Sequence, residues 1–238
     1  MSISKKLSRH RIKRLVLVAV VILFIAVGAL MGVSYWVGYK LAHPAHLPLS
    51  SNPAWWGMRF HNVEFNVSTH SLRLKGWWIP AIGSDLTVIM THGYRNNRVG
   101  HTVPQLAVAR ALHVMGANVL MFDFRGSGDS AGHLASVGIF EQRDILAADH
   151  AVLTRWRPKS TVVLLGYSMG ASSALMAAAE DPRVAGVIAD SPFADLTQYL
   201  KPKRYPVPIR RSWRNLTFPT PPDLRPMPRV VPPSMAGS

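Results

Sequence analysis

Four short apolar runs alternate with three helical patterns between residues 86 and 192. The runs are 86–93, 118–126, 161–168 and 184–192, and each has Gly or Ser within its last two residues. The helical patterns are 103–115, 139–156 and 169–180. Short apolar runs are typical of parallel strands buried on both faces, and the helices between them supply the crossovers. The alternation predicts an α/β domain with a mostly parallel sheet and helices on both faces.

Two further segments precede this alternation. Residues 61–67 alternate apolar and polar side chains, and residues 72–79 do so in part. This pattern predicts antiparallel edge strands with one face toward water. Because ligands bind at the carboxyl ends of the strands in open parallel sheets, we expect the functional site where the apolar runs end.

An uncharged stretch of 25 residues, 15–39, lies near the start of the chain. At about 1.5 Å per residue it is longer than the roughly 30 Å of a bilayer's hydrocarbon. Six Lys or Arg and no acid lie in residues 1–14, and Tyr35, Trp36 and Tyr39 lie toward the far end. The charge asymmetry predicts a single-pass signal-anchor with its N-terminus in the cytoplasm and the rest of the chain on the outer side. A cleaved signal peptide is the alternative, although its apolar region is normally shorter, about 7–15 residues.

The net charge of +15 is concentrated at the two ends of the chain. Residues 201–238 hold eight Lys or Arg against one acid, whereas residues 15–200 hold thirteen bases against eleven acids. A basic face on the folded domain is therefore not indicated, which argues against a nucleic-acid partner. The chain has no cysteine, so disulfides and thiolate chemistry are excluded.

The composition divides the chain into five parts. They are a basic cytoplasmic tail (1–14), a transmembrane helix (15–39), a linker (40–59), an α/β domain (60–200) and an irregular tail (201–238). The last part has ten prolines among 38 residues, which is incompatible with helices or central strands. One hypothesis is that the chain leaves its original reading frame after Leu200, and resequencing that finds no downstream frame with further strand–helix units and a histidine would refute it. The alternative is a genuine basic tail that meets anionic lipid or cell-wall polymer, which salt-sensitive liposome binding would reveal.

Residues 166–170, GYSMG, place Ser168 between two glycines, at the end of an apolar run and the start of a helical pattern. The Gly-x-Ser-x-Gly pattern is typical of a sharp strand-to-helix turn that exposes a nucleophilic serine hydroxyl. A helix that begins at Met169 would direct its unpaired N–H groups and its positive dipole end toward an oxyanion beside Ser168.

Residues 60–200 resemble the α/β-hydrolase fold, in its single-domain serine esterase or peptidase-like branch. The motifs that carry the resemblance are THGYRNNR, FDFRGSGDSAG, GIFEQRDILAADHAV, GYSMGA and ADSPF, in that order. The resemblance implies that Ser168 is the nucleophile, that the backbone N–H groups of Met169 and Tyr94 form the oxyanion hole, and that His92 and Gly93 shape its loop. It also implies a small-molecule or peptide substrate with an ester, amide or related acyl bond, and neither a metal nor an organic cofactor.

The rest of a catalytic triad is not evident. All ten histidines precede Ser168, whereas the fold's chain order is Ser, then Asp or Glu, then His. Asp190 is the one candidate acid. We interpret His92 as a hydrogen-bonding turn residue rather than a base, and Asp123, Glu141 and Asp144 as structural.

The sequence therefore predicts a membrane-anchored serine hydrolase that is C-terminally truncated. Whether it is active stays open, since no histidine follows the nucleophile. The alternative is a non-catalytic, membrane-tethered remnant or binding protein. The loss of later strands would leave the sheet edge after VAGVIAD exposed. Neither the substrate nor the oligomeric state is indicated.

Overall fold

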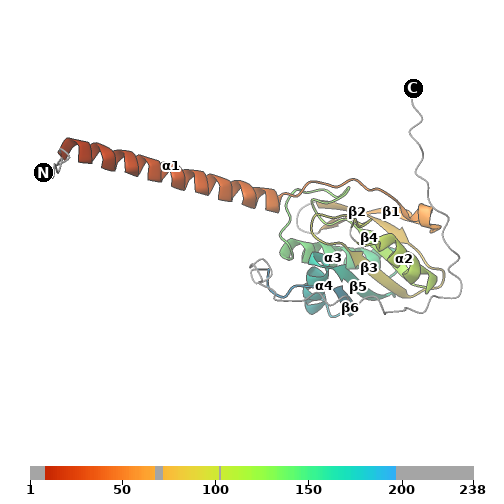
Figure 1. Ribbon diagram of the computed structural model, residues 1–238. Coiled ribbons are helices and arrows are strands. Elements are labelled where there is room, and N and C mark those ends of the chain that lie inside the picture. Colours follow the sequence, from red (N-terminus) through yellow and green to blue (C-terminus); the bar gives the residue numbers. More distant parts are fainter. Residues whose placement is uncertain (1–8, 68–71, 102, 197–238) are drawn as a thin grey trace, which may run out of the picture. The chain divides into compact units, whose positions relative to one another are not determined.

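The computed structural model describes residues 9–67, 72–101 and 103–196 of the 238-residue chain. The tail 201–238, for which the sequence leaves two interpretations, lies outside the described residues. The helices are α1 (Arg9–Ala42), η1 (Pro53–Trp56), α2 (Gln105–Val114), α3 (Ile139–Ala151) with a π-helical extension η2 (Val152–Trp156), and α4 (Met169–Glu180). The strands are β1 (His61–Val67), β2 (Leu72–Ile79), β3 (Leu86–Thr91), β4 (Asn118–Phe122), β5 (Thr161–Tyr167) and β6 (Val184–Asp190) (Figure 1).

The six strands of the described region form one mixed sheet in the order β1-β2-β4-β3-β5-β6. Strands β4, β3, β5 and β6 are parallel, and β1 and β2 join them as an antiparallel pair. This confirms the predicted sheet. The prediction of two edge strands is wrong for β2, which pairs with β4 through residues 76–79. Its second half, Gly76 to Ile79, is buried because Trp77 and Trp78 pack on opposite faces of the sheet.

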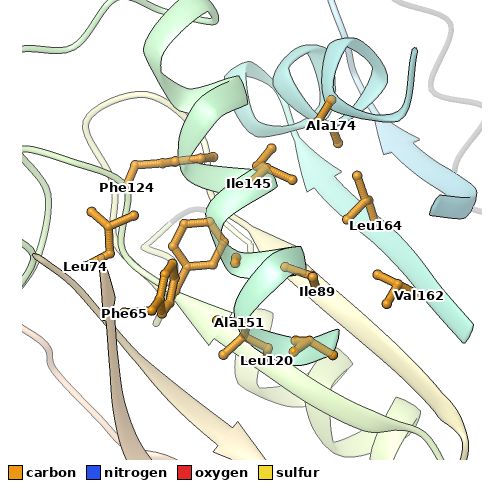
Figure 2. Packing of buried hydrophobic residues seen from close by; sticks show 14 of the residues in the cluster. Phe65, Leu74, Ile89, Leu120, Phe124, Ile145, Ala151, Val162, Leu164 and Ala174 are labelled. Carbon is orange, nitrogen blue, oxygen red and sulfur yellow. The ribbon is translucent and has the colours of Figure 1, made fainter. Parts of the chain in front are cut away.

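Helices cover both faces of the sheet, and alternate residues of each strand contribute to two separate cores. Ile89 and Leu120 face the core under α3 and α4, whereas Met90 and Met121, the next residues along, face the core under α2. Figure 2 shows the first core, in which side chains from the sheet meet Ile145 of α3 and Ala174 of α4. The expected arrangement of helices on both faces is thus observed.

Helix α1 extends beyond both ends of the predicted span 15–39. Residues Arg11–Ala42 have a mean hydropathy of 3.0 in their most apolar window, and none of that window is buried. The helix is therefore long and apolar enough to cross a membrane. After it, residues 43–52 run along the domain, where Asn97 donates side-chain hydrogen bonds to the carbonyls of Leu47 and Pro48.

The strands end just before the residues that the sequence singled out. Strand β3 ends at Thr91, one residue before His92, and β4 ends at Phe122, one residue before Asp123. Strand β5 ends at Tyr167, directly before Ser168. The parallel register brings these three ends to one edge of the sheet, with Thr91 opposite Gly166.

Candidate active site

Ser168 occupies a sharp turn between β5 and α4. Its φ of 52° lies in the left-handed region, which an L-residue other than glycine rarely adopts. Its backbone N–H donates to the carbonyl of Asp190 at the end of β6 (2.8 Å), and its own carbonyl accepts from Ser172 in α4 (3.0 Å). The turn is therefore fixed by the strand beside it and by the helix that follows.

The two glycines of GYSMG are required by close backbone packing. A Cβ atom on Gly166 would lie 2.4 Å from the carbonyl oxygen of Gly170, and one on Gly170 would lie 2.6 Å from the carbonyl oxygen of His92. Real Cβ atoms do not approach backbone atoms so closely. The glycines thus let α4 pack tightly against β5 and the end of β3, which sets the position of Ser168.

A hollow of about 550 Å³ brings the predicted nucleophile and both predicted oxyanion-hole residues together. Ser168, Met169 and Tyr94 all line it, with Phe193 and the end of α1 among its other walls. A smaller hollow of about 120 Å³ is also lined by Ser168, together with Gly93 and Asp190. A cavity of similar size to the first, about 590 Å³, is bordered by Arg143, His150 and Asp181 and has none of these site residues.

Backbone strain is concentrated around Ser168. In the described part of the chain, four residues other than glycine have positive φ: Arg95 (55°), Val137 (57°), Ser168 (52°) and Ser191 (54°). The first three line the large hollow and the fourth lines the small one. Such conformations cost of order 1–3 kcal/mol each and are typical of active sites and ligand-binding loops. The strained residues therefore gather at the same edge of the sheet as the candidate site.

His92 has both ring nitrogens engaged in structural hydrogen bonds. Its Nε2 accepts from the backbone N–H of Phe124 (3.1 Å), and its Nδ1 then carries the proton and donates to the carbonyl of Gly93 (2.8 Å). Burial lowers the pKa of His92 from 6.5 to about 4. A neutral imidazole with no free nitrogen cannot take a proton from Ser168, which agrees with the structural interpretation of this residue.

The lowered pKa predicts a pH dependence of stability. Between pH 6.5 and about 4 the unfolded state binds a proton at His92 that the folded state does not. The contribution of neutral His92 to the free energy of unfolding is therefore present in full above pH 6.5. It falls by about 3 kcal/mol as the pH drops to 4. We expect the stability advantage of the parent over His92→Gln to shrink by that amount across this range in urea unfolding. A difference between the two proteins that stays constant with pH would contradict it.

Asp123 organises the loop after β4. Its carboxylate forms a buried ion pair with Arg98 and accepts the backbone N–H groups of Arg98 (2.7 Å) and Asp129 (2.9 Å). Burial raises the pKa of Asp123 to about 6, against the opposing attraction of Arg98. These contacts make Asp123 a structural residue, as expected from the sequence.

Asp144 joins α3 to the loop after β4, and Glu141 holds the start of α3. Asp144 accepts the Nη2 (2.6 Å) and Nε (3.0 Å) groups of Arg125, and its burial raises its pKa to about 6. Glu141 accepts from the hydroxyl of Ser136 and from the backbone N–H of Gly138, both at 2.7 Å. Neither carboxylate lines the hollows beside Ser168.

Asp190, the candidate acid, lies at the edge of the small hollow with its side chain exposed. Its Oδ1 accepts from the hydroxyl of Ser191 at 2.8 Å. Within residues 9–67, 72–101 and 103–196, no side chain forms a hydrogen bond with the Ser168 hydroxyl, although His101 lines the same hollow. The same residues contain no group of three or more His, Asp or Glu that could hold a metal ion.

The sequence analysis missed the contribution of α1 to this site. Gly38, Leu41 and Ala42, at the end of the helix, line the large hollow. The contact joins residues more than 50 positions apart, so no local pattern indicates it. The aromatic residues Tyr35, Trp36 and Tyr39 near the end of the apolar stretch indicate a membrane interface and give no sign of this contact.

The sheet order, the covering helices and the strand–Ser168–helix turn together define an α/β hydrolase. Within that class the chain belongs to the family described as serine aminopeptidase, S33, whose model matches residues 84–235.

Proteins similar to this chain include bacterial and archaeal ones. An uncharacterized protein of Mycobacterium tuberculosis is 33% identical over 59% of this chain and 48% of its own length, and the uncharacterized protein YfhR of Escherichia coli is 32% identical over 56% and 47%. The chain thus spans about half the length of the curated relatives it matches. The Pyrococcus furiosus esterase Pf2001 superposes with a TM-score of 0.60 at 34% identity, over 65% of this chain and 57% of that one.

Proposed function

We propose that this chain is a membrane-anchored serine hydrolase that cleaves carboxylic esters through Ser168. The observation that carries the proposal is the strained turn that holds Ser168 beside the hollow it shares with Tyr94 and Met169. Backbone N–H groups at the start of α4 and in the loop at Tyr94 would stabilise the oxyanion. The similarity to an archaeal esterase supports the same reaction class.

The ester is favoured over the amide by the chemistry of the leaving group. An amine must be protonated before it departs, and a histidine normally supplies that proton. The one histidine directly after β3, His92, has both nitrogens occupied. An alkoxide is a better leaving group than an unprotonated amine. An ester is therefore the substrate that these residues would cleave most readily.

The anchor is the second element of the proposal. Helix α1 is long and apolar enough to span a bilayer, and the basic residues before it favour a cytoplasmic N-terminus. The linker and the α/β domain, residues 40–200, would then lie on the outer side. Asp190 remains the candidate acid, because it is the one carboxylate lining a hollow with Ser168 among the described residues.

A fluorophosphonate probe tests the nucleophile directly. We expect a soluble, membrane-impermeant probe to label the full chain in intact cells and to label Ser50→Ala equally, since Ser50 is exposed and lines neither hollow. Ser168→Ala should not be labelled. If parent and Ser168→Ala are both unlabelled, in cells and as purified protein, the hydrolase proposal fails and the non-catalytic alternative stands.

A further inference from the structure

The last turn of α1 is part of the wall beside Ser168. Gly38, Leu41 and Ala42 line the hollow of about 550 Å³ together with Ser168. Two hydrogen bonds fix the end of the helix: the hydroxyl of Tyr94 donates to the carbonyl of Leu41, and the N–H of Ala135 donates to the carbonyl of Ala42 (2.8 Å). Tyr94 thus joins the predicted oxyanion loop to the helix.

If α1 spans a bilayer, the length of the apolar stretch would place this hollow at the membrane surface. Residues 15–39 extend about 37 Å as a helix, compared with about 30 Å of hydrocarbon. Gly38 belongs to this uncharged stretch and also lines the hollow. With α1 in a bilayer, the hollow beside Ser168 therefore opens in the head-group layer, within reach of lipid acyl chains.

A second hollow of about 320 Å³ adjoins the first and carries positive charge. The two share Leu41 and Arg95, and the second is also lined by Lys40, Trp36 and His43. No Asp or Glu is among the described residues that line either hollow. Two cations with a tryptophan at the interface suit an anionic head group.

We propose that the substrate is a membrane lipid with a carboxylic ester and an anionic head group. This inference rests on the proposed function, since it takes Ser168 as nucleophile and α1 as anchor. The acyl chain lies in the hollow beside Ser168, and the head group lies against Lys40 and Arg95. The Ser168 oxygen bonds to the ester carbonyl carbon, the bond to the alcohol oxygen breaks, and the hydroxyl proton leaves with the alcohol. Water then hydrolyses the acyl-serine to a fatty acid and restores the serine.

A photoreactive lipid tests the binding step without requiring catalysis. The full chain is placed in vesicles of phosphatidylcholine that carry a small fraction of diazirine-bearing phosphatidylglycerol, and the cross-linked residues are mapped by mass spectrometry. We expect cross-links at Ala135, Val137 and Phe193, which line the hollow but do not belong to α1. Lys40→Gln/Arg95→Gln should lower these cross-links about thirtyfold, since each cation near an anionic surface contributes about 1 kcal/mol. The control Arg59→Gln/Lys159→Gln removes the same charge at exposed positions that line neither hollow and should leave them unchanged.

The outcomes separate this inference from the proposed function. Cross-links confined to residues 15–37, or equal cross-linking from a phosphatidylcholine probe, would overturn the inference, even if the soluble fluorophosphonate labels Ser168. Cross-links in the hollow that depend on Lys40 and Arg95 support it. If these appear while Ser168 stays unlabelled, the lipid site is supported, but the hydrolase proposal fails and the lipid is a ligand rather than a substrate.

Discussion

Asp123→Ala is expected to lower the free energy of unfolding by about 3–5 kcal/mol. The substitution leaves the Arg98 guanidinium, whose side chain is 4% exposed, buried without its main counter-charge, and it removes the acceptor of two backbone N–H groups. Arg98 would retain Asp129 and its position 4.4 Å from the centre of the Trp77 ring. A loss of this size is a large part of the 5–15 kcal/mol that stabilises a typical domain.

Urea unfolding of the full chain in detergent, followed by tryptophan fluorescence, measures this effect. Glu64→Ala is the matched control, because Glu64 pairs with Arg73 and Lys75 at the exposed surface, where such pairs contribute about 0–1 kcal/mol. Asp123→Asn keeps the side chain's shape and an acceptor oxygen. Its loss of unfolding free energy should lie between those of Asp123→Ala and Glu64→Ala. Equal losses for Asp123→Ala and Glu64→Ala would show that the buried pair does not hold the loop.

Gly166→Ala is expected to cost about 3 kcal/mol and to displace Ser168. The added Cβ would meet the carbonyl oxygen and carbon of Gly170 at 2.4 and 2.5 Å and the Cα of Ala171 at 2.6 Å. All three are backbone atoms, so no change of rotamer relieves the overlap. Helix α4 must move away from β5. We therefore expect both the free energy of unfolding and the fluorophosphonate labelling of Ser168 to decrease.

Gly186→Ala provides the control for this substitution. Gly186 also lies in a strand, β6, next to β5, but a Cβ there would meet no atom of the described structure within 4 Å. The Gly186→Ala variant should therefore unfold at the same urea concentration as the parent. The fluorophosphonate should label its Ser168 to the same extent. If Gly166→Ala behaves like Gly186→Ala, the glycine is not needed for the close approach of helix and strand.

The sequence predicted the sheet well because its signals are local. Each apolar run of the parallel strands reflects burial on both faces, and the described strands begin at the predicted residues. The ends differ by two or more residues at β3, β4 and β6, since the polar residues after them belong to loops. The prediction that β2 is an edge strand is wrong. Its partial alternation comes from Arg73 and Lys75, whereas Trp77 to Ile79 are buried.

The surroundings of Ser168 were harder to predict, because they depend on contacts between distant segments. The turn itself was indicated by its glycines, which the structure explains by backbone approach to Gly170 and His92. The strained backbone of Arg95 and Val137 left no signal, since neither residue type favours positive φ. The placement of α1 against Tyr94 depends on a side-chain hydrogen bond to a backbone carbonyl 53 residues away.

The hydrogen bond from Ser168 to Asp190 ties the turn to the outermost strand of the described sheet. Strand β6 has no fully buried residue, and Ile188 within it is 51% exposed. Outer strands with few buried contacts open first in partial unfolding. Mild heat or denaturant that frays β6 would therefore release the turn at Ser168 while β3, β4 and β5 stay folded, so that the candidate site would lose its geometry before the sheet unfolds.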